Sequence, residues 1–265
     1  MNTIDKTKTF LMIVLTAVII VFATTLFFTY KTKSFINKKV KTDELVITET
    51  TKNYLINLVP FLGDSKVFYD DNIFSKKKTL VSEVDNNILY EMALNTLNSI
   101  PDDEDLEGNY SWMCYERDLF DSKIKEMYNI SSNTVSRPTL SELGDAKKIY
   151  PMENKVCITH NSNQNPGNVI SSIYKTKKEN KNIVIYTYSL FEDCIKENSA
   201  CDGWNVYSDS KLNNKIDEYL FDEDISDDDI INKHYEEAGR YKHTFKPIEI
   251  DGKTKYYWYS TEKLE

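Results

Sequence analysis

The longest apolar run of the chain lies near its N-terminus. Residues 10–30 read FLMIVLTAVIIVFATTLFFTY and contain no charged side chain. A run of about 20 apolar residues is long enough for one helix to cross the hydrocarbon core of a bilayer. This run exceeds the apolar region of a cleaved signal peptide, and neither an A-x-A pattern nor a lipoprotein cysteine follows it. We therefore predict an uncleaved, single-pass anchor in the lipid bilayer at Phe10–Tyr30, preceded by a short tail at 1–9.

Beyond the anchor the chain becomes polar and divides into two parts. Residues 31–44 are rich in lysine and are expected to form a basic stalk, and residues 45–265 are expected to form one domain. Because lysines concentrate after the span, the positive-inside rule would place this domain in the cytoplasm. The cysteines favour the opposite orientation. We expect an extracytoplasmic domain, with the cytoplasmic orientation as the alternative.

Apolar positions recur at helical spacing in the first half of this domain. Helices are expected within 42–62, over 82–97 with Ser82 as the N-cap, and over 119–128.

The period then changes from 3.6 residues to 2, which predicts strands. The expected strands are Val156–Thr159, Val169–Tyr174, Asn182–Phe191, Trp204–Tyr207 and a hairpin around Asp251-Gly252, with a turn in 175–181. Residues 215–221 suit a strand or a short helix. A further helix is expected to begin after Ser226 and to end at Gly239.

This order of elements predicts an α+β fold in which two to three helices precede an antiparallel sheet. The order is compatible with a helix packed across a curved sheet, as in cystatin-like or NTF2-like folds, by analogy alone.

The four cysteines predict two disulfides. Cys194 and Cys201 are close enough in sequence to close a loop between two strands, which leaves Cys114 and Cys157 as a second pair. An even number of cysteines beyond a membrane span is typical of an oxidising compartment. The alternative is four reduced, unrelated thiols.

Charge and motifs narrow the chemistry. The net charge of −9 argues against nucleic acid as a partner. Residues 102–109 imitate half of a calcium loop, but Cys114 stands where its last ligand is needed, so a solvated acidic loop is expected. Asp227–Asp229 suit the first turn of a helix, where negative charge is stabilising. We expect no cofactor and no metal.

No catalytic residue can be nominated. The sequence contains no HExxH, GxSxG, P-loop or GxGxxG motif, and Cys157 and His160 would point to opposite faces of a strand. Scattered carboxylates leave an envelope hydrolase acting on glycan or peptide as the alternative function, although an enzyme is not the expectation.

The last predicted strand carries four consecutive aromatic residues: Tyr256, Tyr257, Trp258 and Tyr259. These residues are expected to pack on the sheet and its helices, or to form a binding surface for a glycan or an envelope protein.

The C-terminal segment YKHTFKPIEIDGKTKYYWYSTEKLE, with DNNILYEMALNTL and FDSKIKEMYN, resembles small surface proteins of AT-rich Gram-positive bacteria. The resemblance implies one N-terminal span followed by an α+β ectodomain, and it carries over no active residues. Together these observations predict a membrane-anchored, extracytoplasmic binding or structural module of the cell envelope.

Overall fold

The computed structural model describes residues 47–62, 71–100, 111–138, 148–160, 167–197, 200–221 and 225–265. The chain divides into two compact units, Met1–Glu44 and Leu45–Glu265. The predicted tail, anchor and stalk all fall in the first unit and lie outside the described residues. No helix among the described residues is long and apolar enough to cross a membrane.

The second unit is an α+β domain whose sheet is mostly antiparallel. Its helices are α2 (Glu49–Ile56), α3 (Asp71–Ser75), α4 (Asn86–Leu94), α5 (Arg117–Tyr128), α6 (Asp227–Lys233) and the 3-10 turn η1 (Val81–Glu83). Its strands are β1 (Lys78–Leu80), β2 (Ser111–Glu116), β3 (Ile149–Pro151), β4 (Lys155–His160), β5 (Gly167–Glu179), β6 (Asn182–Glu197), β7 (Ala200–Tyr207), β8 (Lys215–Leu220), β9 (Gly239–Ile250) and β10 (Lys253–Leu264).

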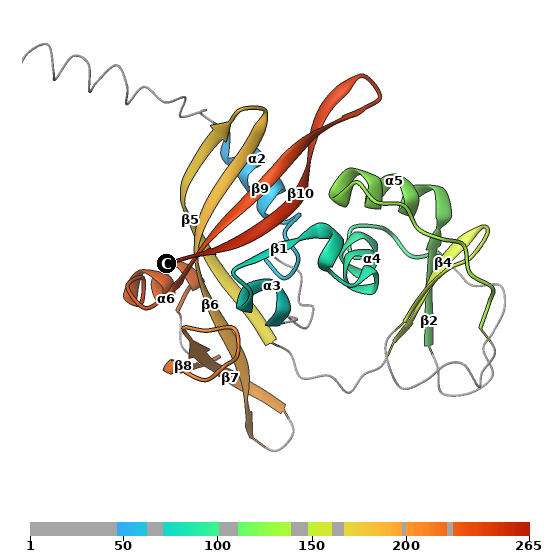
Figure 1. Ribbon diagram of the computed structural model, residues 1–265. Helices are drawn as coiled ribbons and strands as arrows, with labels where there is room; N and C mark the ends of the chain where they lie inside the picture. Colours follow the sequence, from blue (N-terminus) through green and yellow to red (C-terminus); the bar gives the residue numbers. More distant parts are fainter. Residues whose placement is uncertain are drawn as a thin grey trace, which may run out of the picture. The chain divides into compact units, whose positions relative to one another are not determined.

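A seven-stranded antiparallel sheet organises the domain. Its strand order is β1-β10-β9-β6-β7-β8, and β5 pairs with the remaining edge of β6. β6 is the central strand, because it pairs with β5 on one side and with β9 and then β7 on the other. A second, three-stranded sheet has the order β2-β4-β3. Figure 1 shows α6 on one side of the large sheet and α3, α4 and α5 on the other.

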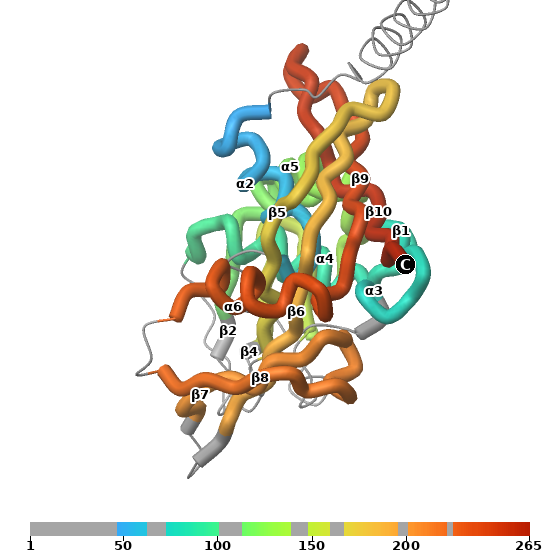
Figure 2. The backbone as a smooth tube through the Cα atoms, turned by 90° about the vertical axis from the view of Figure 1, so that its left-hand side faces the viewer, coloured from blue at the N-terminus to red at the C-terminus, as the bar shows by residue number. Residues whose placement is uncertain are grey.

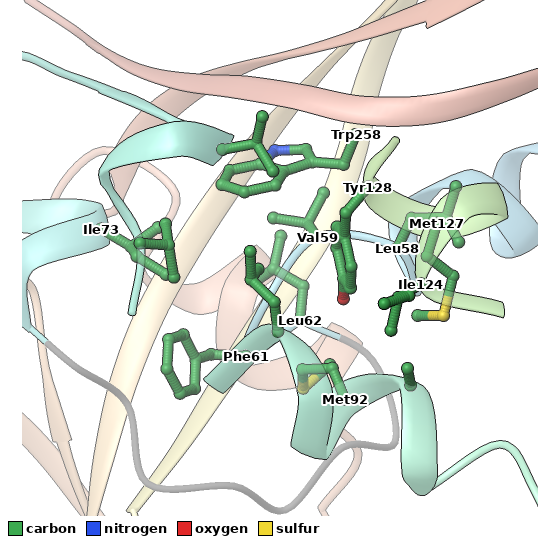
Figure 3. Packing of buried hydrophobic residues seen from close by; sticks show 14 of the residues in the cluster. Leu58, Val59, Phe61, Leu62, Ile73, Met92, Ile124, Met127, Tyr128 and Trp258 are labelled. Atoms are coloured by element: carbon green, nitrogen blue, oxygen red, sulfur yellow. The ribbon is translucent and has the colours of Figure 1, made fainter. Parts of the chain in front are cut away.

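The main core lies between the large sheet and the helices that precede it in the chain. Alternate residues of β6, among them Ile183 and Ile185, point into this core and are almost fully buried. The indole of Trp258 has an exposed fraction of 0% and meets the ring of Tyr128 edge-on at 6.3 Å (Figure 3). Burying side chains of this size is the largest favourable contribution to folding, at roughly 1.5–3 kcal/mol each.

A smaller core lies on the opposite face of the large sheet. Ile230 and Ile231 of α6 pack on Ile170, Leu190 and Val206, which come from β5, β6 and β7. Figure 2 shows α6 lying across β6. Both faces of β6 are therefore buried over the length that α6 covers.

The structure confirms most of the predicted elements and corrects several boundaries. Ser82 lies in η1 and does not cap the following helix. Asp85 is the N-cap of α4, and its Oδ1 accepts the N–H of Asn87 at 2.8 Å. The helix predicted within 42–62 is α2, whose N-cap is Thr48, and the helix predicted at 119–128 is α5.

Three further boundaries differ in the second half of the domain. β5 continues to Glu179, and Asn180, with φ 58°, begins a shorter hairpin turn than predicted. α6 ends at Lys233, so Gly239 is not its cap. Gly239 instead opens β9, where a Cβ would lie 2.7 Å from the Tyr241 ring. The ambiguous segment 215–221 is a strand over most of its length, β8.

Candidate functional site

The outer edge of β5 is an open feature of the domain. Among the strands that the structure describes, β5 pairs only with β6. The N–H of Val169 donates to the side-chain Oδ1 of Asn168 at 3.0 Å and does not join the β6 ladder. Since N–H groups alternate in direction along an antiparallel strand, the N–H of Ser171 also points away from β6. The edge therefore presents backbone groups that another extended chain can pair with.

A groove with a volume of about 840 Å³ runs along the first half of this edge. Four parts of the chain form its walls: α2, the first half of β5, the β7–β8 pair and the first turn of α6. The lining side chains are Glu49, Lys52, Asn53, Ile56, residues 167–173, Cys201, Trp204, Phe221, Asp227 and Asp228. Its volume lies within the range of about 300–1,000 Å³ that is usual for ligand sites.

One wall of the groove is aromatic. The rings of Trp204 and Phe221 meet edge-on with their centroids 5.8 Å apart. Phe221 is 53% exposed, although it is a large apolar side chain. Leu220 precedes Phe221, and Ile225 lies four residues after it. Both are also more than a third exposed. This wall offers apolar area that a ligand can cover.

The rim of the groove is acidic on the side of α6. Asp227 and Asp228 lie in the first turn of α6 and line the groove. Glu49 and Lys52 on the α2 side form an ion pair at 2.9 Å and largely offset one another. A ligand with a positive charge near α6 therefore complements the groove.

A buried carboxyl group lies behind the groove. Glu192 has an exposed fraction of 0%; its carboxylate accepts hydrogen bonds from the Asn168 Nδ2 at 2.9 Å and the Tyr219 hydroxyl at 2.6 Å. Burial and, to a smaller extent, the charge of Asp227 raise the pKa of Glu192 to about 7, against the hydrogen bonds from Tyr219 and Asn168, which lower it. Burial and the Glu192 carboxylate together raise the pKa of Tyr219.

Glu192 links three strands of the sheet at the groove. Asn168 lies on β5, Glu192 on β6 and Tyr219 on β8, and Asn168 itself lines the groove. The two hydrogen bonds fix the edge strand relative to the aromatic wall. No sequence motif predicts this arrangement. A signal is nevertheless present: Glu192 lies on the apolar outer face of β6, and a buried carboxyl group is expected to have hydrogen-bond partners.

A second cluster of charges stabilises the far end of α6. Burial would raise the pKa of Asp217, but hydrogen bonds from Lys233 and His234 lower it to about 2. The Asp217 Oδ2 lies 2.7 Å from the Lys233 Nζ and 2.8 Å from the His234 Nε2. These contacts join α6 to β8 and support the wall of the groove.

The structure confirms both predicted disulfides. Cys114 joins Cys157, its cross-strand neighbour in the β2–β4 pair, and Cys194 joins Cys201 within the β6–β7 hairpin. All four cysteines of the chain are therefore paired. Cys201 also lines the groove, so the second disulfide is part of its wall.

The predicted aromatic surface at 256–259 divides between core and surface. Trp258 is fully buried, whereas Tyr256, Tyr257 and Tyr259 are partly exposed. Tyr256 and Tyr259 pack against the edge of the core, and the Nζ of Lys246 lies 3.2 Å from the centroid of the Tyr259 ring. A binding role for these residues stays a prediction.

Other sequence candidates take no part in the groove or lie outside the described residues. The loop at 102–109, which resembles half of a calcium site, falls in a part that the structure does not describe. Ser226 caps α6 by accepting the N–H of Asp229 at 3.2 Å, as the acidic first turn predicts. Across the described ranges, no group of three or more His, Cys, Asp or Glu side chains is arranged to hold a metal ion.

The groove belongs to an α+β domain of mostly antiparallel sheet, and one of its walls is the unpaired edge of β5. Comparison with protein-family models, curated proteins and solved structures finds no match. The case for function therefore rests on the chemistry of this groove.

Proposed function

We propose that the protein is a membrane-anchored, extracytoplasmic binding module of the cell envelope that takes an extended segment of a partner protein into the groove beside β5. The observation that carries the proposal is the unpaired edge of β5 forming one wall of a groove of about 840 Å³. An extended peptide that adds to a sheet edge gains backbone hydrogen bonds, and side-chain pockets select its sequence.

The walls of the groove define the partner's chemistry. The Trp204–Phe221 pair suits an apolar side chain, and Asp227 with Asp228 suits a lysine or arginine. The partner segment is therefore extended, with an apolar anchor and a basic residue. The groove, and not the 256–259 strand, is the primary site in this proposal.

The location is proposed on two grounds. Two disulfides are typical of an oxidising compartment outside the cytoplasm. The apolar run Phe10–Tyr30 has the length of a membrane-spanning helix. The closer analogy to a helix packed on a curved sheet, as in cystatin-like and NTF2-like folds, also stays a proposal.

The test uses the full chain in phosphatidylcholine nanodiscs and a displayed library of random heptapeptides. Peptides that bind saturably are expected to combine a large apolar residue with lysine or arginine. Ser171→Pro removes an outward-pointing N–H without removing a β5–β6 hydrogen bond, because proline is compatible with an edge strand. We expect Ser171→Pro to weaken peptide binding about tenfold or more.

Ser171→Ala is the matched control, because it removes the hydroxyl and keeps the N–H. It is expected to bind within about twofold of the wild type. The proposal fails if Ser171→Pro and Ser171→Ala bind the selected peptides equally well, or if no heptapeptide binds saturably.

An envelope hydrolase is the second candidate, and the raised pKa of Glu192 beside the groove favours it. A carboxyl that is protonated near neutral pH suits a general acid. Against this, Glu192 is 0% exposed and both of its oxygens are bonded to protein groups. Release of reducing ends from purified peptidoglycan by the wild type, abolished in Glu192→Gln, would support the hydrolase over the binding module.

A further inference from the structure

A second surface lies on the outer face of the sheet, beside α6 and away from the groove. Four tyrosines gather there: Tyr174 of β5, Tyr186 and Tyr188 of β6, and Tyr235 just beyond α6. We call this set the tyrosine face. Tyr174 is 40% exposed and Tyr235 is 47% exposed. Figure 2 shows the upper part of β5 and β6 extending beyond α6.

The rings of the tyrosine face form a continuous series. The centroid of Tyr174 lies 4.4 Å from that of Tyr188 and 6.0 Å from that of Tyr186. Tyr235 meets Tyr188 edge-on at 6.4 Å. Tyr174 occupies a β-bulge, since Ile173 and Lys175 pair with consecutive residues of β6. The bulge turns an additional ring onto this face.

Cations surround these rings. The Nζ atoms of Lys175 and Lys177 each lie 5.4 Å from the Tyr186 centroid, and the Arg240 guanidinium lies 5.7 Å from the Tyr188 centroid. The hairpin end at 175–181 contains four lysines and one glutamate in a chain whose net charge is −9. This region is therefore locally positive, although the protein as a whole is negatively charged.

Two of these cations are available to a ligand. Glu179 lies between Lys177 and Lys242 and is paired with both. Lys175 and Arg240 form no ion pair within the described part of the chain. Glu236 and Glu262 border the face on the α6 and β10 sides. A ligand's acidic groups are therefore expected nearest the hairpin end at 175–181.

We propose that the tyrosine face binds an anionic polysaccharide, whose acidic groups pair with Lys175 and Arg240 while its sugar rings stack on Tyr174. Sugar C–H groups suit the negatively polarised face of an aromatic ring, and the carboxylate or phosphate groups complement the cations. The face is independent of the groove, so this proposal does not rest on peptide binding.

A polymer with charge fits this surface better than a lipid bilayer does. Surfaces that insert into a bilayer present Trp, Phe or Leu. The exposed large apolar side chains of this face are Tyr174 and Tyr235, and no aliphatic residue protrudes beside them among the described residues. Lipid headgroups would engage the lysines but leave the rings without an apolar environment.

The experiment measures binding of fluorescent polygalacturonate oligomers to the full chain in phosphatidylcholine nanodiscs by anisotropy. Two exposed charge contacts are removed in Lys175→Gln/Arg240→Gln, and we expect about a tenfold loss of affinity. The matched control, Lys253→Gln/Lys263→Gln, removes two exposed lysines of β10 and is expected to bind within about twofold of the wild type.

A second pair of variants tests the ring. Tyr174→Ala is expected to weaken polygalacturonate binding about fivefold, and Tyr174→Phe, which keeps the ring, to bind within about twofold of the wild type. Binding is also expected to weaken as salt rises, because exposed charge contacts are screened.

Four results would overturn the proposal. The first is absence of saturable polygalacturonate binding, and the second is equal binding of neutral dextran. The third is equal loss of affinity in the β10 control. The fourth is tighter binding to phosphatidylglycerol vesicles or to oligothymidylate than to polygalacturonate, which would assign the face to lipid or to nucleic acid.

Discussion

Replacing Glu192 with glutamine is expected to stabilise the protein above neutral pH and to destabilise it slightly near pH 4.5. Glu192 is 0% exposed, and burial raises its pKa from 4.5 to about 7. Its folded-state pKa is therefore above its unfolded value. The contribution of Glu192 to stability is fully present below the unfolded pKa, where the folded and unfolded states both bind the proton. This contribution is lost as the pH rises through the folded pKa.

The size of this loss follows from the pKa difference. A shift from 4.5 to about 7 corresponds to roughly 3 kcal/mol of lost stability between about pH 4.5 and about pH 8. Glutamine has nearly the shape of the protonated acid and keeps an oxygen to accept the Tyr219 hydroxyl. Its amide N–H₂ then faces the Nδ2 donor of Asn168, and the lost hydrogen bond costs about 1 kcal/mol at every pH. The free energy of unfolding of Glu192→Gln should therefore be roughly 2 kcal/mol higher than that of the wild type at about pH 8, and about 1 kcal/mol lower at about pH 4.5.

Urea unfolding of the full chain in detergent, followed by tryptophan fluorescence, measures this difference at several pH values. Trp258 is fully buried and reports on the core. Glu237→Gln, at an exposed glutamate before β9, is the control and should follow the wild type at every pH. A Glu192→Gln effect that is the same at all pH values would refute the raised pKa. A variant less stable than the wild type at about pH 8 would show that the carboxylate is favourable in place.

Three further predictions concern buried groups, each checked by urea unfolding of the full chain. His243 is fully buried between Thr187 and Thr261, and burial lowers its pKa from 6.5 to about 3. Its contribution to folding stability is therefore present above the unfolded pKa of 6.5 and is lost as the pH falls towards the folded pKa. The wild type should lose roughly 2 kcal/mol from this group between about pH 7 and about pH 5, and a His243→Gln variant should not; equal pH slopes would contradict this. The two disulfides span 43 and 7 residues, and a longer closed loop loses more entropy in the unfolded chain. Cys114→Ala/Cys157→Ala should therefore lower the free energy of unfolding by about 4 kcal/mol, and Cys194→Ala/Cys201→Ala by about 2.5 kcal/mol. The reverse order would count against loop entropy as the cause. Arg117 is buried and donates hydrogen bonds to Asp121, Ser132 and the Met152 carbonyl. Arg117→Met should therefore lower the free energy of unfolding by about 2 kcal/mol, whereas Arg240→Met at the surface should change it by under about 0.5 kcal/mol. Similar costs would mean that the buried network contributes little to stability.

Local pattern was sufficient to predict much of the fold. β-branched and aromatic residues with period 2 marked β6, and Asp251-Gly252 marked the β9–β10 turn, where both residues have positive φ. The alternation of Tyr241, His243 and Phe245 also places His243 on the core face of β9. Buried polar residues such as His243 follow from strand period once the buried face is known.

Pairing between distant segments could not be predicted in the same way. β6 lies between β5, its neighbour in sequence, and β9, which begins more than 40 residues later. β1 and β2 were not predicted, because each is short and interrupts a series of helices. Their pairing partners, β10 and β4, are distant in the sequence, so no local periodicity identifies them.

The groove could not be predicted because its parts come together only in three dimensions. Its walls join α2, β5, the β7–β8 pair and α6, and no two of these residue sets share a sequence motif. Their relative placement depends on buried hydrogen bonds, since Glu192 joins Asn168 at the strand edge to Tyr219 beside the aromatic wall. The same carboxyl that costs stability when ionised thus holds the edge of β5 in place. When ionised, Glu192 lowers folding stability, and it also positions the walls of a groove of ligand size. Such a residue is expected at a functional site, where selection for function outweighs selection for stability.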